Sequence, residues 1–328
     1  MKLTQIVAVV AEVCTMLVAV AVTAAATAQA QWPDKPIKLV VPYTPGGGTD
    51  TVSRHIAEKI MQDTQWLFVI DNRPGGSGNI GLDFVAKSRP DGLTFGMGQS
   101  ANLAINPAIM KMPFDPAKDV IPVALIAELP LVMVVKTDSP WKSFADAITA
   151  MKAKPGAYKQ ALAGLGTVGH LAGELLAKRT DTKVLNVPYK GAGPALAEVM
   201  GGQTDFMFAT PQAVLGLIKG GKLRALAVTS SARNATLPQV PTVAESGYKD
   251  FEAIDWKVIV APAGTSTEVM KRFNAAIEKA LARPAMVTQL ELEGSAAMGG
   301  SPERAAAYIK SEQAKWGTLI REAGIKLE

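Results

Sequence analysis

Two glycine-rich turns, each followed by a segment with helical patterning, constrain this chain more than any other feature. The first is Pro-Gly-Gly-Gly-Thr-Asp at 45–50, after the apolar run 37–42, and the second is Gly-Leu-Gly-Thr-Val-Gly at 164–169. A glycine turn lets backbone amides approach a ligand without obstruction by Cβ. A helix that starts there directs its unpaired amides and the positive end of its dipole at the same place. One such turn in each half of the chain predicts two anion-binding surfaces that act as a clamp.

Residues 1–30 are typical of an export signal. A lysine near the start precedes an apolar stretch at 6–22, and the segment ends in Ala-Gln-Ala, which fits the small-x-small cleavage rule. A membrane anchor is the alternative, but Glu12 interrupts the apolar stretch and would make it a poor span. We expect cleavage after Ala30 and a mature protein in the periplasm.

The composition disfavours several functional classes. Loss of the signal removes Cys14, the single cysteine, so a mature protein holds no disulfide and no thiolate metal site. The formal net charge of +5 comes from scattered lysines without a basic tract, and aromatic residues make up only 6%. This pattern gives nucleic-acid binding little support and favours anionic ligands by diffuse attraction. We expect no cofactor and no bound metal.

Short apolar runs alternate with longer segments of helical patterning along the mature chain. We expect strands at 37–41, 67–70, 94–97, 131–135, 160–163, 184–187, 205–209, 224–228 and 253–261. We expect helices at 51–61, 82–87, 144–151, 171–178, 194–200, 214–218, 269–281 and 303–323. The alternation predicts an α/β fold with two mostly parallel sheets flanked by helices. In such folds, ligands lie beyond the carboxyl ends of the strands, where the glycine turns also fall.

Two crossings, near 125–132 and 248–255, would divide the mature chain into two lobes. Domain 1 would be discontinuous, made of 31–128 plus 253–328, and domain 2 would be 129–252. Two adjacent crossings make a hinge, and a hinge between lobes that each carry an anion-binding turn predicts a ligand trap.

Five motifs run in a fixed order along the chain. They are IKLVVPYTPGGGTD at 37–50, DNRPGGSGNIG at 71–81, GLGTVGHLA at 164–172, VPYKGAGPA at 187–195 and APAGT at 261–265. Together they resemble the Bug family, the TctC-like periplasmic solute receptors of tripartite tricarboxylate transporters.

The resemblance covers essentially the whole mature chain. It implies a two-lobed periplasmic binding protein of the Venus-flytrap type, which holds a small organic acid mainly through backbone amides and ordered waters. The partners it implies are a mono- or dicarboxylate ligand, aromatic acids included, and the integral-membrane permease subunits of the transporter. We expect a monomer.

The candidate ligand-binding residues of domain 1 lie in or beside glycine turns and at the end of one strand. Those at 44–49 offer amides and hydroxyls, whereas Asp50 is interpreted as a cap of the next helix because its charge would repel an anion. The turn at 75–78 is either a second amide-rich mouth or a plain tight turn. The full set is Tyr43, Thr44, Gly47, Gly48, Thr49, Ser77, Gly78, Ser100 and Asn102.

The candidates of domain 2 surround the second glycine turn and the 188–193 turn that the resemblance adds. His170 either donates to a carboxylate or serves in packing and capping. Asp205 either contacts the ligand, as an ammonium partner in receptors for amino acids, or sets a turn. The full set is Gly166, Thr167, His170, Tyr189, Gly191 and Asp205.

Other functions are weaker or remain open. The 164–169 turn satisfies G-x-G-x-x-G, but the acidic residue expected after the next strand is missing; Gly-Gly-Ser-Gly-Asn at 75–79 misses G-x-S-x-G by one residue. An exported enzyme acting on carboxylates is therefore disfavoured. A ligand-sensing subunit for a membrane signalling kinase remains an alternative, because it would need the same closed-lobe surface. Trp256, Phe208 and Met207 are either apolar walls for an aromatic acid or core residues.

Overall fold

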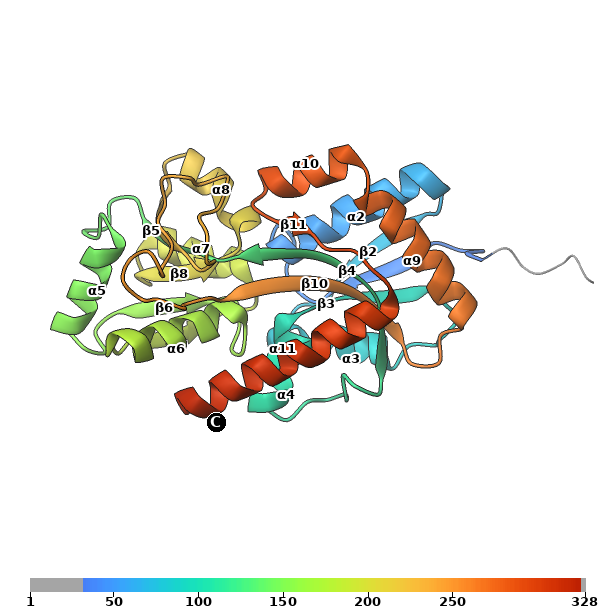
Figure 1. Ribbon diagram of the computed structural model, residues 1–328, viewed down its shortest axis with the longest axis horizontal. Helices are drawn as coiled ribbons and strands as arrows, with labels where there is room; N and C mark the ends of the chain where they lie inside the picture. Colours follow the sequence, from blue (N-terminus) through green and yellow to red (C-terminus); the bar gives the residue numbers. More distant parts are fainter. Residues whose placement is uncertain (1–31, 326–328) are drawn as a thin grey trace, which may run out of the picture. The chain divides into compact units, whose positions relative to one another are not determined.

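The computed structural model describes residues 32–325, so the predicted export signal lies outside the described residues. Residues from Pro36 onward form one compact unit, which contains two β-sheets flanked by helices (Figure 1). Within the described residues, no helix is both long enough and apolar enough to cross a membrane.

The first lobe contains a six-stranded sheet in the order β11-β4-β10-β3-β1-β2. Its strands are β1 (Ile37–Val41), β2 (Phe68–Asn72), β3 (Thr94–Gln99), β4 (Val120–Pro130), β10 (Ile254–Pro262) and β11 (Ala296–Ala297). Its helical elements are α2 (Gly48–Thr64), η1 (Gly76–Gly78), α3 (Asn79–Ala86), η2 (Ala101–Ile105), α4 (Asn106–Ile109), α9 (Thr267–Leu281), α10 (Pro284–Leu292) and α11 (Pro302–Ala323). Helices α2, α9 and α10 lie on one side of the sheet, and α3, α4 and α11 on the other (Figure 1).

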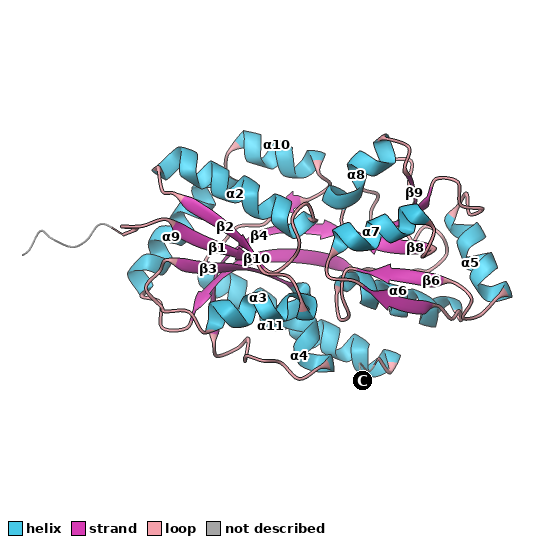
Figure 2. Cartoon of the chain, turned by 180° about the vertical axis from the view of Figure 1, so that it is seen from behind, coloured by secondary structure: helices cyan, strands magenta, loops and turns pink. Residues whose placement is uncertain are grey.

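The second lobe contains a five-stranded sheet in the order β7-β6-β8-β5-β9. Its strands are β5 (Val132–Lys136), β6 (Lys159–Leu162), β7 (Leu185–Pro188), β8 (Phe206–Ala209) and β9 (Leu223–Val228). Its helices are α5 (Phe144–Ala153), α6 (Val168–Thr180), α7 (Ala192–Gly201) and α8 (Pro211–Lys219). Figure 2 shows α7 and α8 on one side of this sheet and α6 on the other.

The apolar patterning explains how these layers pack. In α2, Val52, Ile56 and Ile60 recur at four-residue spacing and are fully buried against the sheet. On the same side, Phe273 of α9 lies with its ring centroid 4.2 Å from that of Phe95 in β3. This packing of helices against the sheet holds the strand ends, and the turns that follow them, in fixed positions.

The α/β fold class and the two helix-flanked sheets are confirmed, but the expectation of mostly parallel sheets is wrong. Among the described strands, β1 runs parallel to β2 and β3, and β6 runs parallel to β7 and β8. The other five pairs, which all involve β4, β5 or β10, are antiparallel. The cause is topological: the chain leaves the first lobe along β4 into β5 and returns along β10, so the outgoing and returning strands run in opposite directions.

The crossing expected near 125–132 covers the second half of β4 and the start of β5, and β4 has a proline near each end. The structure places Pro122 beside an irregularity in the β4–β10 ladder and Pro130 at the strand's last position. β11 pairs with β4 only at Ala127 and Glu128. Proline is tolerated at such positions, where a ladder donor is not required.

The two crossing segments are held together by one buried threonine. The Thr229 hydroxyl accepts a hydrogen bond from the Leu131 amide at 2.7 Å and donates to the Ala253 carbonyl at 2.6 Å. Leu131 follows β4, and Ala253 precedes β10. The lobe boundaries at residues 128 and 253 stay a prediction.

Candidate functional site

A cavity of about 60 Å³ lies between the lobes, beyond the ends of β1 and β3. Elements from both sheets contribute to it, so neither lobe forms it alone. Its lining residues are Tyr43, Gly47, Gly48, Thr49, Gln99, Leu131, Ala163, Thr167, Val168, Gly169, Ala192, Met207, Phe208, Ala209, Thr210, Asp255 and Lys257. Hereafter this space is called the cleft cavity.

Four helices begin at the cleft cavity: α2, α6, α7 and α8. Their N-cap residues are Gly47, Thr167, Gly191 and Thr210. Each helix N-terminus carries about half a positive charge, concentrated on amides that have no partner within the helix. The four together present roughly two positive charges to one enclosed space.

The way these helices are capped leaves their amides available. Three helices away from the cleft cavity have a serine cap: Ser143, Ser266 and Ser301 accept hydrogen bonds from first-turn amides of α5, α9 and α11, respectively. Others, such as α3 and α10, have no side-chain cap. At the cleft cavity, α2, α7 and α8 have no side-chain cap, and two of them begin at glycine. Only α6 uses its cap residue, Thr167, for this purpose. Amides that no side chain satisfies at a closed cavity are suited to an external acceptor.

A buried ion pair forms one wall of the cleft cavity. Lys257 is 1% exposed; its ammonium donates to Gln99 Oε1 at 2.8 Å and pairs with the carboxylate of Asp255. Asp255 Oδ1 in turn accepts from the Ser100 hydroxyl at 2.6 Å and the Trp256 amide at 3.0 Å. These contacts compensate the cost of burying both charges.

Tyr43 and Thr49 complete this wall. The Thr49 hydroxyl donates to Gln99 Oε1 at 2.6 Å, and the Tyr43 hydroxyl donates to the Ser77 carbonyl at 2.9 Å. Burial raises the pKa of Tyr43, and the carboxylate of Asp255 raises it further, against a hydrogen bond with Gln99. The phenol therefore stays neutral across the physiological range.

The lobes touch each other at glycines around the cleft cavity. A Cβ at Gly48 would overlap the Thr210 hydroxyl, and a Cβ at Gly191 would overlap the Thr44 hydroxyl. Gly191 also has a φ of +129°, which side-chain-bearing residues rarely adopt. These two glycines let the loops of opposite lobes approach to van der Waals contact.

A second space of about 260 Å³ adjoins this region and shares Tyr43 with it. The turn at 75–78 faces the 163–165 and 188–190 segments across it. The predicted residues Ser77, Gly78 and Tyr189 line this second space. Thr44 and Gly191 meet between the lobes, whereas Tyr43, Gly47, Gly48, Thr49 and Thr167 line the cleft cavity itself.

Three of the residues predicted in domain 2 form hydrogen bonds within the protein. His170 Nδ1 accepts a hydrogen bond from the Gly166 amide at 3.2 Å, and its Nε2 lies 3.5 Å from a Glu174 oxygen, so the imidazole braces the glycine turn. The Gly166 amide is consumed by that contact. Asp205 precedes β8 and accepts from the Lys159 amide at 2.7 Å, at the end of β8 away from the cleft cavity. These contacts give His170, Gly166 and Asp205 roles within the protein, and their contact with a ligand stays a prediction.

Two predicted residues of domain 1 lie behind the cleft cavity. Ser100 is fully buried and orients Asp255. Asn102 accepts from the Gln99 amide at 3.0 Å, and its Nδ2 lies under Gly78. The strand before them continues to Gln99, so the residue that reaches the cavity is Gln99.

Asp50 lies in the first turn of α2, not at the N-cap. Its carboxylate accepts from the Gly46 amide, from Arg54 and from Asn72, each at 2.9 Å. Burial alone would raise the pKa of Asp50, but these hydrogen bonds outweigh that effect and lower it. Asp50 thus fixes the first glycine turn from behind.

Sequence reasoning missed four polar residues of the cleft cavity: Gln99, Thr210, Asp255 and Lys257. The last two carried a usable signal, because an Asp and a Lys two positions apart inside an apolar strand point to the same face. Of the three large side chains left open, Met207 and Phe208 line the cavity. Trp256 is a core residue whose indole donates to Glu312 at 3.0 Å.

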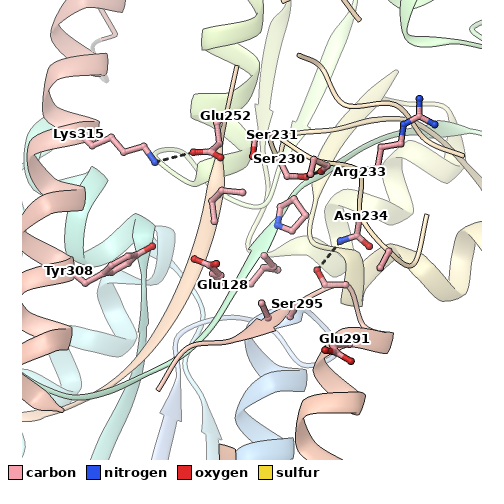
Figure 3. Close-up of a pocket in the computed structure, with 17 residues that line it drawn as sticks. Glu128, Ser230, Ser231, Arg233, Asn234, Glu252, Glu291, Ser295, Tyr308 and Lys315 are labelled. Atoms are coloured by element: carbon pink, nitrogen blue, oxygen red, sulfur yellow. Dashed lines mark hydrogen bonds and ion pairs between the residues drawn. The ribbon is translucent and has the colours of Figure 1, made fainter. Parts of the chain in front are cut away.

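A larger cavity of about 420 Å³ lies beside the crossing strands and is called here the hinge cavity (Figure 3). Three acidic residues line it: Glu128, Glu252 and Glu291. Both of its basic residues are already ion-paired: Arg233 with Glu245, and Lys315 with Glu252 of the same cavity and with Glu312. Figure 3 shows Lys315 reaching Glu252, while Glu128 stands between Tyr308 and Ser295. Despite its volume, this cavity is poorly suited to an anion.

Within residues 32–325, no group of three or more His, Cys, Asp or Glu residues is placed to hold a metal ion. The candidate site is thus a closed, donor-rich cavity between two lobes, built from helix N-termini and one buried lysine. This arrangement defines a two-lobed solute-binding receptor.

Solved structures agree with that class. Rpa4515 of R. palustris, solved with adipate, superposes with a TM-score of 0.87 at 35% identity, covering 90% of this chain and 99% of that one. The periplasmic binding protein BugD also gives a TM-score of 0.87, at 31% identity over 90% of this chain and all of that one. MatC from Rhodopseudomonas palustris, with bound malate, gives 0.83 at 28% identity over 88% of this chain and all of that one.

Sequence comparisons narrow the class to a family. The model of the tripartite tricarboxylate transporter family receptor matches residues 52–325. Protein BugT of Bordetella pertussis is 35% identical over the full length of both chains. A protein from the tcbD-tcbE intergenic region of a Pseudomonas species is 39% identical, covering 89% of this chain and 87% of the relative. The chain belongs to the tripartite tricarboxylate transporter receptor family, whose members are solute-binding receptors and not enzymes.

Proposed function

We propose that the protein captures a small organic carboxylate between its lobes in the periplasm and presents it to the permease of a tripartite tricarboxylate transporter. One observation carries the proposal: four helix N-termini meet at one enclosed cavity, and three of them have no side-chain cap. The adipate in Rpa4515 and the malate in MatC support the ligand class.

The bound carboxylate accepts hydrogen bonds from first-turn amides of α2 in one lobe and from those of α6, α7 or α8 in the other. A net contribution of about 1.5–3 kcal/mol for each hydrogen bond to a charged group gives micromolar affinity with a few contacts, after the costs of association. Water bridges supply further contacts where the amides lie too far for direct ones. Met207 and Phe208 form the apolar wall for the carbon skeleton.

Because the carboxylate needs both lobes, binding favours the closed arrangement over any open one. We assign the hinge to the crossings at Leu131 and Ala253, which Thr229 holds side by side. The permease recognises the surface that the two lobes form when closed. The predicted export signal delivers the protein to the periplasm.

A thermal-shift and calorimetry panel tests the function. It contains succinate, glutarate, adipate, malate, benzoate and 3-phenylpropionate, with the amines putrescine and choline as controls of opposite charge. We expect at least one acid at about 100 times its dissociation constant to stabilise the protein by roughly 2.7 kcal/mol. Stabilisation by the amines alone, or by no acid, would contradict the proposed function.

A further inference from the structure

The amide oxygen of Gln99 and the carboxylate of Asp255, which line the cleft cavity, are already engaged within the protein. Gln99 Oε1 accepts from both the Thr49 hydroxyl and the Lys257 ammonium. Asp255 Oδ1 accepts from Ser100 and the Trp256 amide, and its Oδ2 pairs with Lys257. Gln99 Oε1 and Asp255 Oδ1 each accept from two donors already, so a ligand donor finds only the second lone pair of Asp255 Oδ2, beside the Lys257 ammonium.

The donors of the same cavity are in surplus. A lysine ammonium has three N–H groups, and the two contacts of Lys257 leave one for a ligand. The Thr210 hydroxyl is buried without a hydrogen-bond partner among the described residues. The uncapped first turns of α2, α7 and α8 add backbone amides. A ligand rich in acceptors, such as a carboxylate, satisfies this surplus better than one that must also donate.

The charges at the cleft cavity also disfavour a ligand that carries an ammonium group. Asp255 is the single carboxylate lining the cleft cavity within the described chain, and the adjacent charge of Lys257 neutralises it. A ligand ammonium that approached Asp255 would also approach Lys257, and two like charges at such short range in a buried site repel strongly. Its desolvation would then have no compensating partner.

We propose that this receptor selects carboxylates that lack an amino group and rejects amino acids of the same carbon skeleton, and that Lys257 sets this selectivity. The inference rests on the proposed function and adds the substrate class. Lys257 has two roles. It donates a hydrogen bond to the ligand carboxylate, and it pairs with the Asp255 carboxylate, which would otherwise bind a ligand ammonium group.

Calorimetry with matched pairs tests the inference on the unaltered protein. The pairs are succinate and aspartate, adipate and 2-aminoadipate, and 3-phenylpropionate and phenylalanine, all at pH 7.5. In each pair whose acid binds, we expect the plain acid to bind about 30-fold or more tightly than the amino acid. Equal affinities, or a preference for the amino acid, would overturn the inference and leave the proposed function standing. Absence of binding by every compound would overturn both.

The variant Lys257→Met tests whether Lys257 sets the selectivity. Loss of the ammonium frees Asp255 Oδ2, so the ratio of acid affinity to amino-acid affinity should fall about tenfold or more. Lys315→Met, which removes a half-exposed lysine of the hinge cavity, should leave the ratio unchanged. An unchanged ratio in folded Lys257→Met would contradict the role of Lys257. If that variant does not fold, the matched pairs still decide the selectivity.

Discussion

The cleft cavity and the hinge cavity differ in volume and in the charge of the residues that line them, and we propose the smaller one as the binding site. About 60 Å³ in the cleft is surrounded by helix N-termini and a buried lysine, whereas about 420 Å³ at the hinge is bordered by three glutamates. Both use residues near the start of β10, and Asp255 and Lys257, which alternate with Ile254 and Trp256, face the cleft. Volume alone would favour the hinge cavity, although its three glutamates disfavour an anion.

The largest expected effect comes from a substitution that adds an atom where the two lobes touch beside the cleft cavity. Gly48→Ala places a Cβ against Thr210 across the interface, so the closed form must open slightly. We expect an affinity loss of about 100-fold for the best-bound carboxylate, or roughly 2.7 kcal/mol. Titration calorimetry measures it.

Gly216→Ala is the matched control for that change. It is also a helical glycine, but a Cβ there has no neighbour within 4 Å, so affinity should stay within about twofold. Equal affinities for Gly48→Ala and Gly216→Ala would show that the described contact between the lobes is not the one that holds the ligand.

A smaller effect separates the two cavities directly. Thr210→Val removes the unpartnered hydroxyl at the start of α8, and we expect about tenfold weaker carboxylate binding. Glu128→Gln, an isosteric change in the hinge cavity, should change affinity by less than about twofold. The reverse pattern would move the anion site to the hinge.

The smallest effect concerns the turn that supports the cleft from behind. The hydrogen bonds from Arg54, the Gly46 amide and Asn72 hold the pKa of Asp50 below its ordinary value of 3.8. A depressed folded-state pKa means that the stabilisation is fully present above about pH 4 and is lost as the pH falls through the folded value. The stability difference between the wild type and Asp50→Asn should therefore be about 1 kcal/mol at pH 7 and shrink below pH 4.

Urea unfolding at pH 7 and pH 3 checks this. Asp138→Asn, an exposed carboxylate on the second lobe, serves as the control and should show little change at either pH. A stability difference for Asp50→Asn that grew on acidification would reverse the assigned sign.

The amide part of the site could be predicted from sequence because it is local. A glycine turn followed by a helix determines where the free amides are, and Gly47, Gly48 and Thr49 do line the cavity. Whether an amide already donates a hydrogen bond within the protein depends on the tertiary structure. His170 consumes the Gly166 amide, and nothing in the order of those residues distinguishes that contact from a ligand contact.

Which side chains reach the cleft cavity depends on the direction of each strand and on the elements packed beside it. Asp205 was associated with the cleft through β8, but it precedes that strand, at the end opposite the cavity. Lys257 and Asp255 lie inside the strand expected at 253–261, and their place at the cavity depends on the neighbouring Gln99 and on the second lobe, which are distant in sequence. The antiparallel strands at the crossing follow from chain topology, which local patterns do not encode.

The position of a bound carboxylate tests the central claim most directly. We would determine a crystal structure of the protein with whichever acid of the panel titrates most tightly. The account predicts a carboxylate group in the cleft cavity, within about 3.2 Å of a first-turn amide of α2 and of at least one amide from α6, α7 or α8. A carboxylate bound in the hinge cavity, or one held in the cleft without any helix N-terminal amide, would contradict it.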